Sequence, residues 1–338
     1  MTVKINKRPA GALVGIAVLL LVSCIAALLL GSTRLSLAQV IRDGMAGQFQ
    51  SLAWRVFYYV RVPRVLGAVL CGSGLAVSGA VLQAVLNNSL AGPSTIGVNA
   101  GAGFATLLVM ALFPMHTALL PMASFAGALV CTLVIYLAAR ITGASRMTIV
   151  LAGVAVSSVI NAASSAVKTL FPDVLAAYNS FSVGTLNGVQ LTQLKAAMPY
   201  LAVGLISALL LSGDMNVLAL GEETARSLGL RVERCRMLLI FTAAVLAGAS
   251  VSFCGLVGFV GLLVPHAARL LFGVDHRLVV TASALLGAAS VVLCDLLGRT
   301  LFAPFELPVG VVLALVGGVG FLALLFHRKG GGKLHASL

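Results

Sequence analysis

The sequence predicts an all-α polytopic membrane protein with about ten transmembrane helices. Two observations carry this prediction: 60% of the 338 residues are hydrophobic while 9% are charged, and the apolar residues form long unbroken runs. Soluble domains carry about 25% charged residues, so the composition excludes a soluble enzyme, a nucleic-acid-binding domain and a disordered chain. The runs lack the short alternating pattern of a β-barrel. The 36 glycines indicate close packing, because small residues let helices approach one another in lipid.

Ten apolar runs are candidate membrane spans, since a transmembrane helix needs about 20 apolar residues. The first contains a lipoprotein-like Leu21-Val22-Ser23-Cys24 but stays apolar through Leu30, so we expect an uncleaved span. The run near 256–272 is short and contains Gly and Pro, which makes it a candidate for partial crossing. The runs lie near 10–31, 62–86, 94–113, 117–140, 147–169, 195–212, 233–253, 256–272, 277–297 and 307–326.

The distribution of Lys and Arg predicts that both termini lie in the cytoplasm. With the N-terminus inside, inner segments hold 14 of the 22 basic residues and outer segments hold 8, in line with the excess of positive charge on cytoplasmic segments. We therefore expect one transmembrane domain over 1–338. It has cytoplasmic tails at 1–9 and 327–338 and a bundle over 10–326.

Five of the eight outer cations lie between residues 34 and 64, where Asp43 is the single acid. They are Arg34, Arg42, Arg55, Arg61 and Arg64. This pattern indicates either a docking surface for an acidic partner or side chains that snorkel to the membrane interface. Near the other outer end, Asp295 and Arg299 are four residues apart, in the favourable order for a helix pair.

Polar residues in the fifth run share one helical face. They are Ser157, Asn161, Ser164, Ser165 and Lys168, spaced three or four apart. Such a stripe faces either a water-filled path or a neighbouring helix that accepts its hydrogen bonds. Four of the five side chains are uncharged. Such a stripe is better able to line a path for a large, shape-matched solute than for a bare ion, which needs many oxygen ligands.

Three inner segments interrupt the apolar pattern. The breaks at 87–93 and 140–146 are candidate gates or ordinary turns. The segment 213–232 has a helical pattern but is too polar to cross lipid. It is either a docking element on the inner face or a loop.

The chain carries no motif for chemistry of its own. Gly330-Gly331-Gly332-Lys333-Leu334 lacks the spacing and hydroxyl of a Walker A phosphate loop. The six cysteines lie in or beside apolar runs without metal-ligand spacing and are expected to be buried apolar side chains. We therefore predict no enzyme activity, no metal site and no nucleic-acid partner.

Motifs spread over nearly the whole length resemble the FecCD-type permeases of ABC importers for iron–siderophore complexes, haem and cobalamin. Each motif alone is weak, but the set in this order and spacing is highly specific. The motifs are Arg61-Val62-Pro63-Arg64, Ser78-Gly79-Ala80 with Gln83, Asn88-Ser89-Leu90-Ala91-Gly92-Pro93-Ser94 ending at Gly97-Val98, Leu218 to Gly229, Gly258-Phe259-Val260-Gly261-Leu262-Leu263-Val264-Pro265-His266-Ala267-Ala268-Arg269, Asp275-His276-Arg277, and Glu306-Leu307-Pro308-Val309-Gly310.

The resemblance implies a ten-helix permease in the bacterial cytoplasmic membrane. It implies a second permease chain, identical or related, with the pathway on the two-fold axis. Two cytoplasmic ATPase subunits would bind ATP and Mg, no cofactor would bind this chain, and an external binding protein would deliver the substrate. Carried over residue by residue, it implies binding-protein docking at Arg61, Arg64 and Arg299; ATPase coupling at Leu218, Gly221, Glu222, Glu223, Ala225, Arg226, Ser227, Leu228 and Gly229; and a cytoplasmic gate at Asn88, Ser89, Leu90, Ala144 and Ser145.

We therefore expect the permease subunit of an importer for a metal chelate. Iron–siderophore is the first candidate cargo, and haem and cobalamin are alternatives. An ion-coupled secondary transporter is the alternative from another class. That class commonly buries acids near the midplane, whereas the acids of the expected spans are Asp295, near an outer end, and Glu233, at the first position of the run near 233–253.

Overall fold

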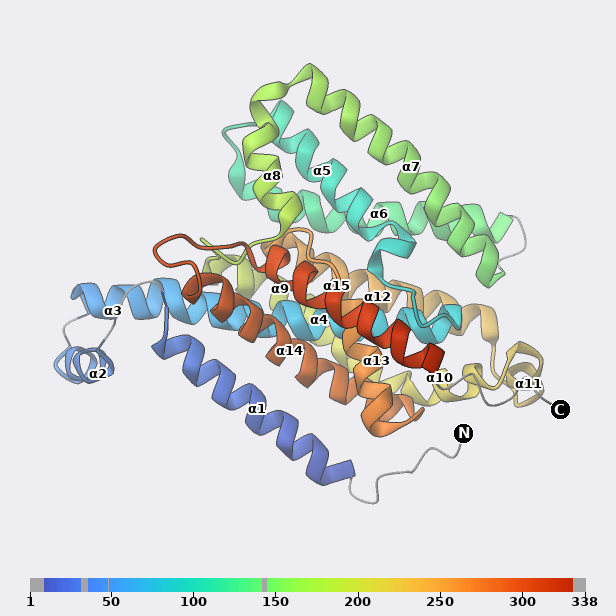
Figure 1. The fold of residues 1–338 in the computed structure, drawn as a ribbon. Helices are drawn as coiled ribbons and strands as arrows, with labels where there is room; N and C mark the ends of the chain where they lie inside the picture. The colour runs from blue at the N-terminus through green and yellow to red at the C-terminus, as the bar shows by residue number, and fades with distance from the viewer. Residues whose placement is uncertain (1–8, 32–35, 48, 142–144, 331–338) are drawn as a thin grey trace.

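The computed structural model describes residues 9–31, 36–47, 49–141 and 145–330, and all regular secondary structure in these ranges is helical. Each of the ten expected spans coincides with one helix (Figure 1). These helices are α1 (Pro9–Leu29), α4 (Val62–Leu86), α5 (Val98–Leu112), α6 (Leu120–Ile141), α7 (Arg146–Leu170), α9 (Leu191–Leu210), α12 (Val232–Cys254), α13 (Val260–Phe272), α14 (His276–Thr300) and α15 (Val309–Gly330).

Short helices lie at the two ends of the bundle. The segment before α4 forms α2 (Leu37–Met45), α3 (Leu52–Val56) and η1 (Phe57–Arg61), a π-helical turn that runs directly into α4. A further helix, α8 (Leu175–Val183), follows α7. Figure 1 places α2 and α3 at one end and α10 (Ser212–Ala219) and α11 (Glu222–Ser227) at the other. The start of α1 and the end of α15 lie toward the end that carries α10 and α11, as an even number of spans requires.

Seven helices of the described chain are long and apolar enough to cross a membrane. Helices α5 and α13 have 15 and 13 residues, which correspond to about 22 and 20 Å against a hydrocarbon core of about 30 Å. The sequence pattern anticipated the short α13. It did not anticipate the short α5, because η2 (Pro93–Ile96) and Gly97 replace the first turn of the expected span.

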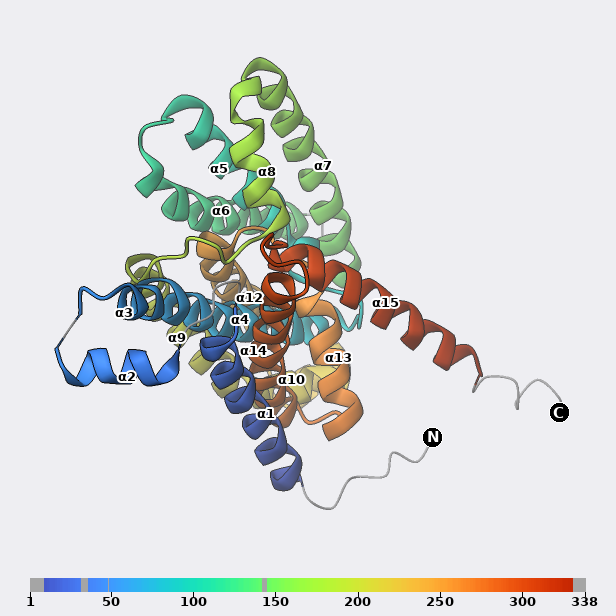
Figure 2. The ribbon, with the colours of Figure 1, turned by 60° about the vertical axis from the view of Figure 1, so that its left-hand side comes forward.

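Helix α4 is the centre of the bundle. It packs against α14, α12, α13 and α9, and most of its residues are buried. Two groups flank it: α5 to α8 on one side, and α1, α13, α14 and α15 on the other (Figures 1 and 2). Helix α12 lies between the groups, in contact with α4, α6 and α9.

Small residues allow this packing. A Cβ atom built at Gly72 would lie 2.2 Å from the carbonyl oxygen of Gly287 in α14, and one at Gly79 would lie 1.7 Å from the carbonyl oxygen of Gly261 in α13. No side chain fits at these two distances. The backbones of α4, α13 and α14 are therefore in direct contact, as is typical of glycine-rich membrane helices.

Replacing Gly79 with Ala should separate α4 from α13. We expect Gly79→Ala to lower the free energy of unfolding by about 1–3 kcal/mol, the usual range for overpacking a core. The matched control is Gly15→Ala in α1, where a Cβ would meet nothing within 4 Å and Ala is the better helix former. Thermal unfolding of detergent-purified protein measures both, and equal stability of the two variants would contradict the packing described here.

Candidate functional site

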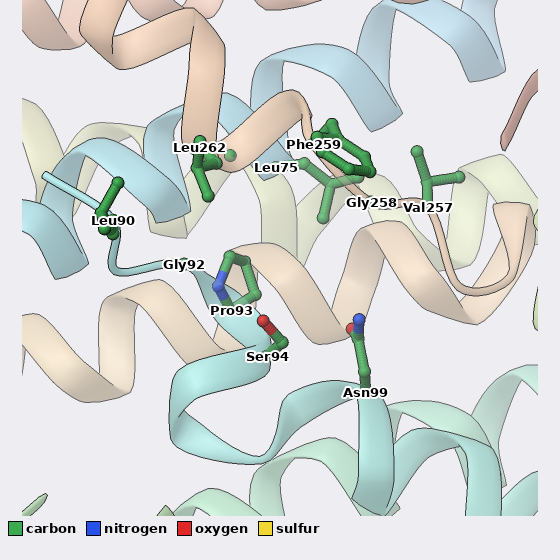
Figure 3. A pocket seen from close by; sticks show the side chains of 11 residues that line it. Leu75, Leu90, Gly92, Pro93, Ser94, Asn99, Val257, Gly258, Phe259 and Leu262 are labelled. Carbon is green, nitrogen blue, oxygen red and sulfur yellow. The ribbon is translucent and has the colours of Figure 1, made fainter. Parts of the chain in front are cut away.

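A cavity of about 260 Å³ lies where two irregular segments meet (Figure 3). One is the segment 87–97 between α4 and α5, and the other is the turn 255–259 between α12 and α13. Figure 3 shows Asn99 pointing from α5 toward the turn that carries Phe259, with Ser94 and Pro93 of the first segment beside it. The cavity is lined by Leu75, Leu90, Gly92, Pro93, Ser94, Asn99, Val257, Gly258, Phe259, Gly261 and Leu262.

Local sequence explains why the first segment leaves helical geometry. Asn87 ends α4 in the left-handed conformation (φ 47°), a position that Asn tolerates. The side-chain oxygen of Asn88 then accepts a hydrogen bond from Leu90 N at 2.9 Å. Gly97 precedes α5 with φ 73°, and a Cβ there would lie 2.4 Å from Ile135 Cδ1. Both the positive φ and the close contact require glycine.

The second segment holds a strained residue. Phe259 has φ 64° and ψ −32°, a conformation that costs a bulky residue about 1–3 kcal/mol and persists only where packing enforces it. Its partner is Gly317 of α15, where an added Cβ would lie 2.7 Å from the Phe259 Cβ. Gly261 in turn lies against the Leu75 carbonyl of α4. Tight contacts with α4 and α15 therefore fix the turn.

The polar stripe lies on α7, as expected, but none of its five residues lines this cavity. Asn161 and Ser165 are exposed, whereas Ser157, Ser164 and Lys168 are partly or fully buried. The hydroxyls of Ser164 and Ser165 donate to carbonyls of their own helix, at 2.9 and 3.0 Å, rather than to another helix. The Lys168 ammonium lies 4.3 Å from the centre of the Tyr178 ring in α8, a cation–π contact.

The candidate gate residues lie at the inner ends of α4 and α7. Asn88, Ser89 and Leu90 are exposed, and Leu90 also lines the cavity. Ser145 caps α7 by accepting a hydrogen bond from Thr148 N at 3.1 Å. Ala144 lies outside the described residues.

Two of the five arginines expected in the outer basic patch, Arg61 and Arg64, are buried, which corrects the expectation for these two, whereas Arg42 and Arg55 are exposed. Arg61, Arg64 and Arg299 are 2%, 6% and 3% exposed. Arg61 donates to the carbonyl oxygens of Leu28 and Leu29 at 2.7 and 2.6 Å, and Arg299 donates to that of Ala27 at 2.5 Å. Two guanidinium groups therefore bind the carbonyl end of α1, where a helix carries partial negative charge.

Two acids balance the charge of Arg64 and Arg299. Arg64 Nε lies 3.0 Å from Asp295 and its Nη1 lies 2.7 Å from Glu306, while Arg299 Nε lies 3.5 Å from Asp295. The pairing of Asp295 with Arg299 agrees with their spacing along the chain. The pairing of Arg64 with Asp295 and Glu306 was not predicted, because 231 and 242 positions separate the partners.

A second cavity, of about 310 Å³, lies beside this charge cluster. Arg64 and Glu306 line it, together with Ser180, Thr185, Asn187, Leu307 and Pro308. Glu306 is the most exposed member of the cluster, with 24% of its side chain accessible. The cluster thus reaches solvent through Glu306, while Asp295 stays inside.

The polar inner segment forms the two short helices α10 and α11. Leu218 and Ala225 are buried, Gly221 and Glu222 are half-buried, and the other expected coupling residues are exposed: Glu223, Arg226, Ser227, Leu228 and Gly229. Glu222 binds both Arg236 of α12 at 2.5 Å and Arg146 of α7 at 3.3 Å. The segment therefore presents an exposed face while ion pairs tie it to two long helices.

A hydrogen-bonded cluster attaches the same segment to α14. Asn216 of α10 donates to Asp275 at 2.9 Å and accepts a hydrogen bond from the His276 backbone N at 2.9 Å. Hydrogen bonds from Asn216 and from the Arg277 backbone lower the pKa of Asp275 below its ordinary value. Because that pKa is depressed, the contribution of Asp275 to stability is complete above the ordinary value and is lost as pH falls through the lowered one.

Comparison with models of known protein families identifies the family of this chain. The model of the FecCD transport family matches residues 19–327. The chain belongs to this family. It is accordingly a transport subunit and a multi-pass protein of the bacterial cytoplasmic membrane.

Relatives in the FecCD family cover almost the full chain. The Fe(3+)-citrate import system permease protein YfmE of Bacillus subtilis is 34% identical, over 96% of this chain and 97% of its own. The ferric enterobactin transport system permease protein FepD of Escherichia coli is 35% identical, over 94% and 96%. The hemin transport system permease protein HmuU of Yersinia pestis is 34% identical, over 82% and 84%. A solved structure described as an inward-facing ABC transporter of metal-chelate type matches with TM-score 0.83 and 28% identity, over 94% and 99% of the two chains.

Removing Arg64 should destabilise this FecCD permease. Arg64→Met removes one of the two arginine partners of Asp295 and the ion pair between Arg64 and Glu306. We expect the free energy of unfolding to fall by about 3–5 kcal/mol, as for other broken buried pairs. The control is Arg55→Met on the exposed face of α3, which should change stability by less than about 0.5 kcal/mol. Thermal unfolding in detergent compares them; an Arg64 variant as stable as the control would show that the cluster contributes nothing.

Proposed function

We propose that this chain is the permease subunit of an ATP-driven importer that translocates a metal chelate, with iron–siderophore as the first candidate cargo. The observation that carries the proposal is the match to the FecCD family over residues 19–327. The exposed face of α11 and the turn after it supports the proposal, because the sequence has no ATP-binding motif and an importer of this kind needs a surface for its ATPase. Two ATPase subunits would hold the ATP and Mg, and this chain would hold no cofactor.

The contacts of α11 suggest how ATPase motion would reach the pathway. Glu222 links the docking segment to Arg146 at the start of α7 and to Arg236 near the start of α12. Asn216 links the same segment to the start of α14. A shift of α10–α11 would therefore move three long helices at their inner ends. The differential contact that drives the switch would belong to the ATPase dimer.

A second permease chain, identical or related, would complete the pathway. Helix α7 exposes Asn161 and Ser165 in the single chain, beside large exposed apolar residues such as Val154 and Val159. Its polar stripe would border a path shared by two copies. The candidate gate at Asn88, Ser89, Leu90, Ala144 and Ser145 would close that path on the cytoplasmic side.

Docking of an external binding protein would involve the end that carries α2 and α3. Of the three arginines given this role by resemblance, Arg64 borders a cavity there. Arg61 and Arg299 hold the end of α1, so their effect on docking would be indirect. Exposed Arg42 and Arg55 add positive charge at this end and would attract an acidic partner.

Two alternatives concern the cargo, haem or cobalamin, and one concerns the mechanism, an ion-coupled transporter. Haem and cobalamin remain candidate cargoes, because the relatives named for cobalamin and hemin import are 38% and 34% identical, close to the iron-chelate relatives. An ion-coupled transporter needs an acid that can bind or release a cation. Asp295, the buried acid of α14, is instead paired with Arg64 and Arg299.

Affinity purification in mild detergent, with the neighbouring genes expressed, tests the proposal. We expect an ATPase subunit to co-purify at one copy per permease chain, and its hydrolysis to be stimulated by the external binding protein. Leu228→Glu, on the exposed face after α11, should reduce recovery of the ATPase at least tenfold, since 1.4 kcal/mol of lost interface energy has that effect.

Met115→Glu is the matched control. Met115 is 90% exposed in the turn after α5, away from α10–α11, so recovery of the ATPase should be unchanged. Recovery of the permease alone, inactive toward ATP, would contradict the proposal and favour the ion-coupled alternative. Equal recovery with both variants would remove α10–α11 as the docking segment.

A further inference from the structure

Two cysteines from different helices are in contact inside the bundle. Cys71 of α4 and Cys254, the last residue of α12, have sulfur atoms 3.1 Å apart. Both are buried, with exposures of 0% and 1%. A disulfide bond has a length of about 2.05 Å, so the two sulfurs would close to bonding distance by an approach of roughly 1 Å.

The backbone around Cys254 is held in place. Its carbonyl oxygen accepts a hydrogen bond from Thr185 N at 2.9 Å, and Leu256 N donates to Phe181 O at 2.9 Å. Gly255 between them has φ 73°, and a Cβ there would lie 2.3 Å from Phe181 O. Because α4 also packs directly on α12, the two sulfurs are held together by contacts on both sides.

A cavity lies beside Cys254, the end of this pair nearer the outer face. Cys254 lines a cavity of about 140 Å³ together with Thr185, Asn187 and Gln193. Thr185 and Asn187 also line the cavity beside Arg64, so both cavities lie at the same end of the molecule. With the proposed orientation this end faces the outside of the cell, where disulfides form and persist.

We propose that Cys71 and Cys254 form a redox pair that closes to a disulfide when peroxide enters from the outer face. The sulfur of Cys254, the residue of the pair that lines this cavity, attacks a peroxide oxygen; the O–O bond breaks, leaving a sulfenic acid and one water. The Cys71 sulfur then attacks the Cys254 sulfur, the S–O bond breaks, and a second water leaves. Two thiols are oxidised to one disulfide while hydrogen peroxide is reduced to two waters.

The disulfide would affect the cavity between segments 87–97 and 255–259, because Cys254 is joined directly to one of its walls. Cys254 is followed directly by the turn 255–259, whose residues Val257, Gly258 and Phe259 form one wall of the cavity in Figure 3. A covalent link to α4 would fix the start of this turn. The oxidised protein should therefore show slower amide hydrogen exchange at 255–259 than the reduced protein.

The test treats the purified full chain with hydrogen peroxide, denatures it without reductant, alkylates it and maps the peptides by mass spectrometry. We expect four of the six cysteines to be alkylated and a linked peptide pair to carry Cys71 and Cys254, with a mass lower by two hydrogens. Reduction before alkylation should restore all six labels.

Single variants identify the partners, and the wild-type measurement stands even if one of them fails to fold. Cys71→Ala and Cys254→Ala should each abolish the linked peptide. Cys235→Ala, a buried cysteine elsewhere in α12, should leave it unchanged. Six alkylated cysteines after peroxide, or irreversible oxidation of Cys254 with Cys71 still alkylated, would overturn the proposal. A linked pair that forms without slower exchange at 255–259 would refute its effect on the cavity.

Discussion

Helices α5 and α13 are too short to cross the hydrocarbon core, so each begins inside the molecule after a stretch of irregular backbone. Lipid cannot satisfy free backbone N–H and C=O groups, and irregular backbone at membrane depth is tolerated where protein buries it or where it lines a polar cavity. The segments 87–97 and 255–259 are partly buried by the surrounding helices, and they line a cavity whose walls are mostly apolar, with Ser94 and Asn99 as its polar side chains. Side chains such as Asn88 and Thr95 bind backbone amides of the first segment, and the two segments together line one cavity.

This arrangement requires α4 to lie very close to its neighbours. Glycines at the contacts with α13 and α14 allow backbone to meet backbone, which brings the start of α13 beside the middle of α4. The strained Phe259 belongs to the same set of contacts, since its conformation is held between α4 and α15. Close packing and irregular backbone therefore depend on each other in this fold.

Electrostatics organise the end that carries α2 and α3. Arg64, Asp295, Arg299 and Glu306 balance one another in a region with little water, where an unpaired charge would be strongly unfavourable. Two of the arginine side chains in this region also bind the carbonyl end of α1. The cluster thus attaches α1 to α4 and α14 and leaves Glu306 as its contact with solvent.

Hydropathy predicted the number and order of the membrane helices, because each span is a local property of the chain. The helical segment 213–232 was predicted for the same reason. Contacts between distant residues were not predictable: the burial of Arg61 and Arg64 depends on α1 and α14, and the partner of Cys71 lies 183 positions away. The start of α5 was placed too early because composition does not show that Pro93–Ile96 forms a 3-10 turn before the α-helix begins. The stripe on α7 was assigned to the right helix, but helical spacing alone does not say what the stripe faces.

The proposed function is tested most directly by asking whether water reaches the cavity between segments 87–97 and 255–259, which Leu90 of the candidate gate lines, during transport. The direct measurement is the reaction of a membrane-impermeant thiol reagent with Asn99→Cys in a cysteine-free background, reconstituted in vesicles with the partner ATPase, with and without ATP. Val130→Cys, on an exposed apolar face of α6, is the lipid-facing control. The account predicts that Cys at position 99 reacts, at a rate that changes with ATP, while Cys at position 130 does not react. Equal protection of both positions in every state would contradict it.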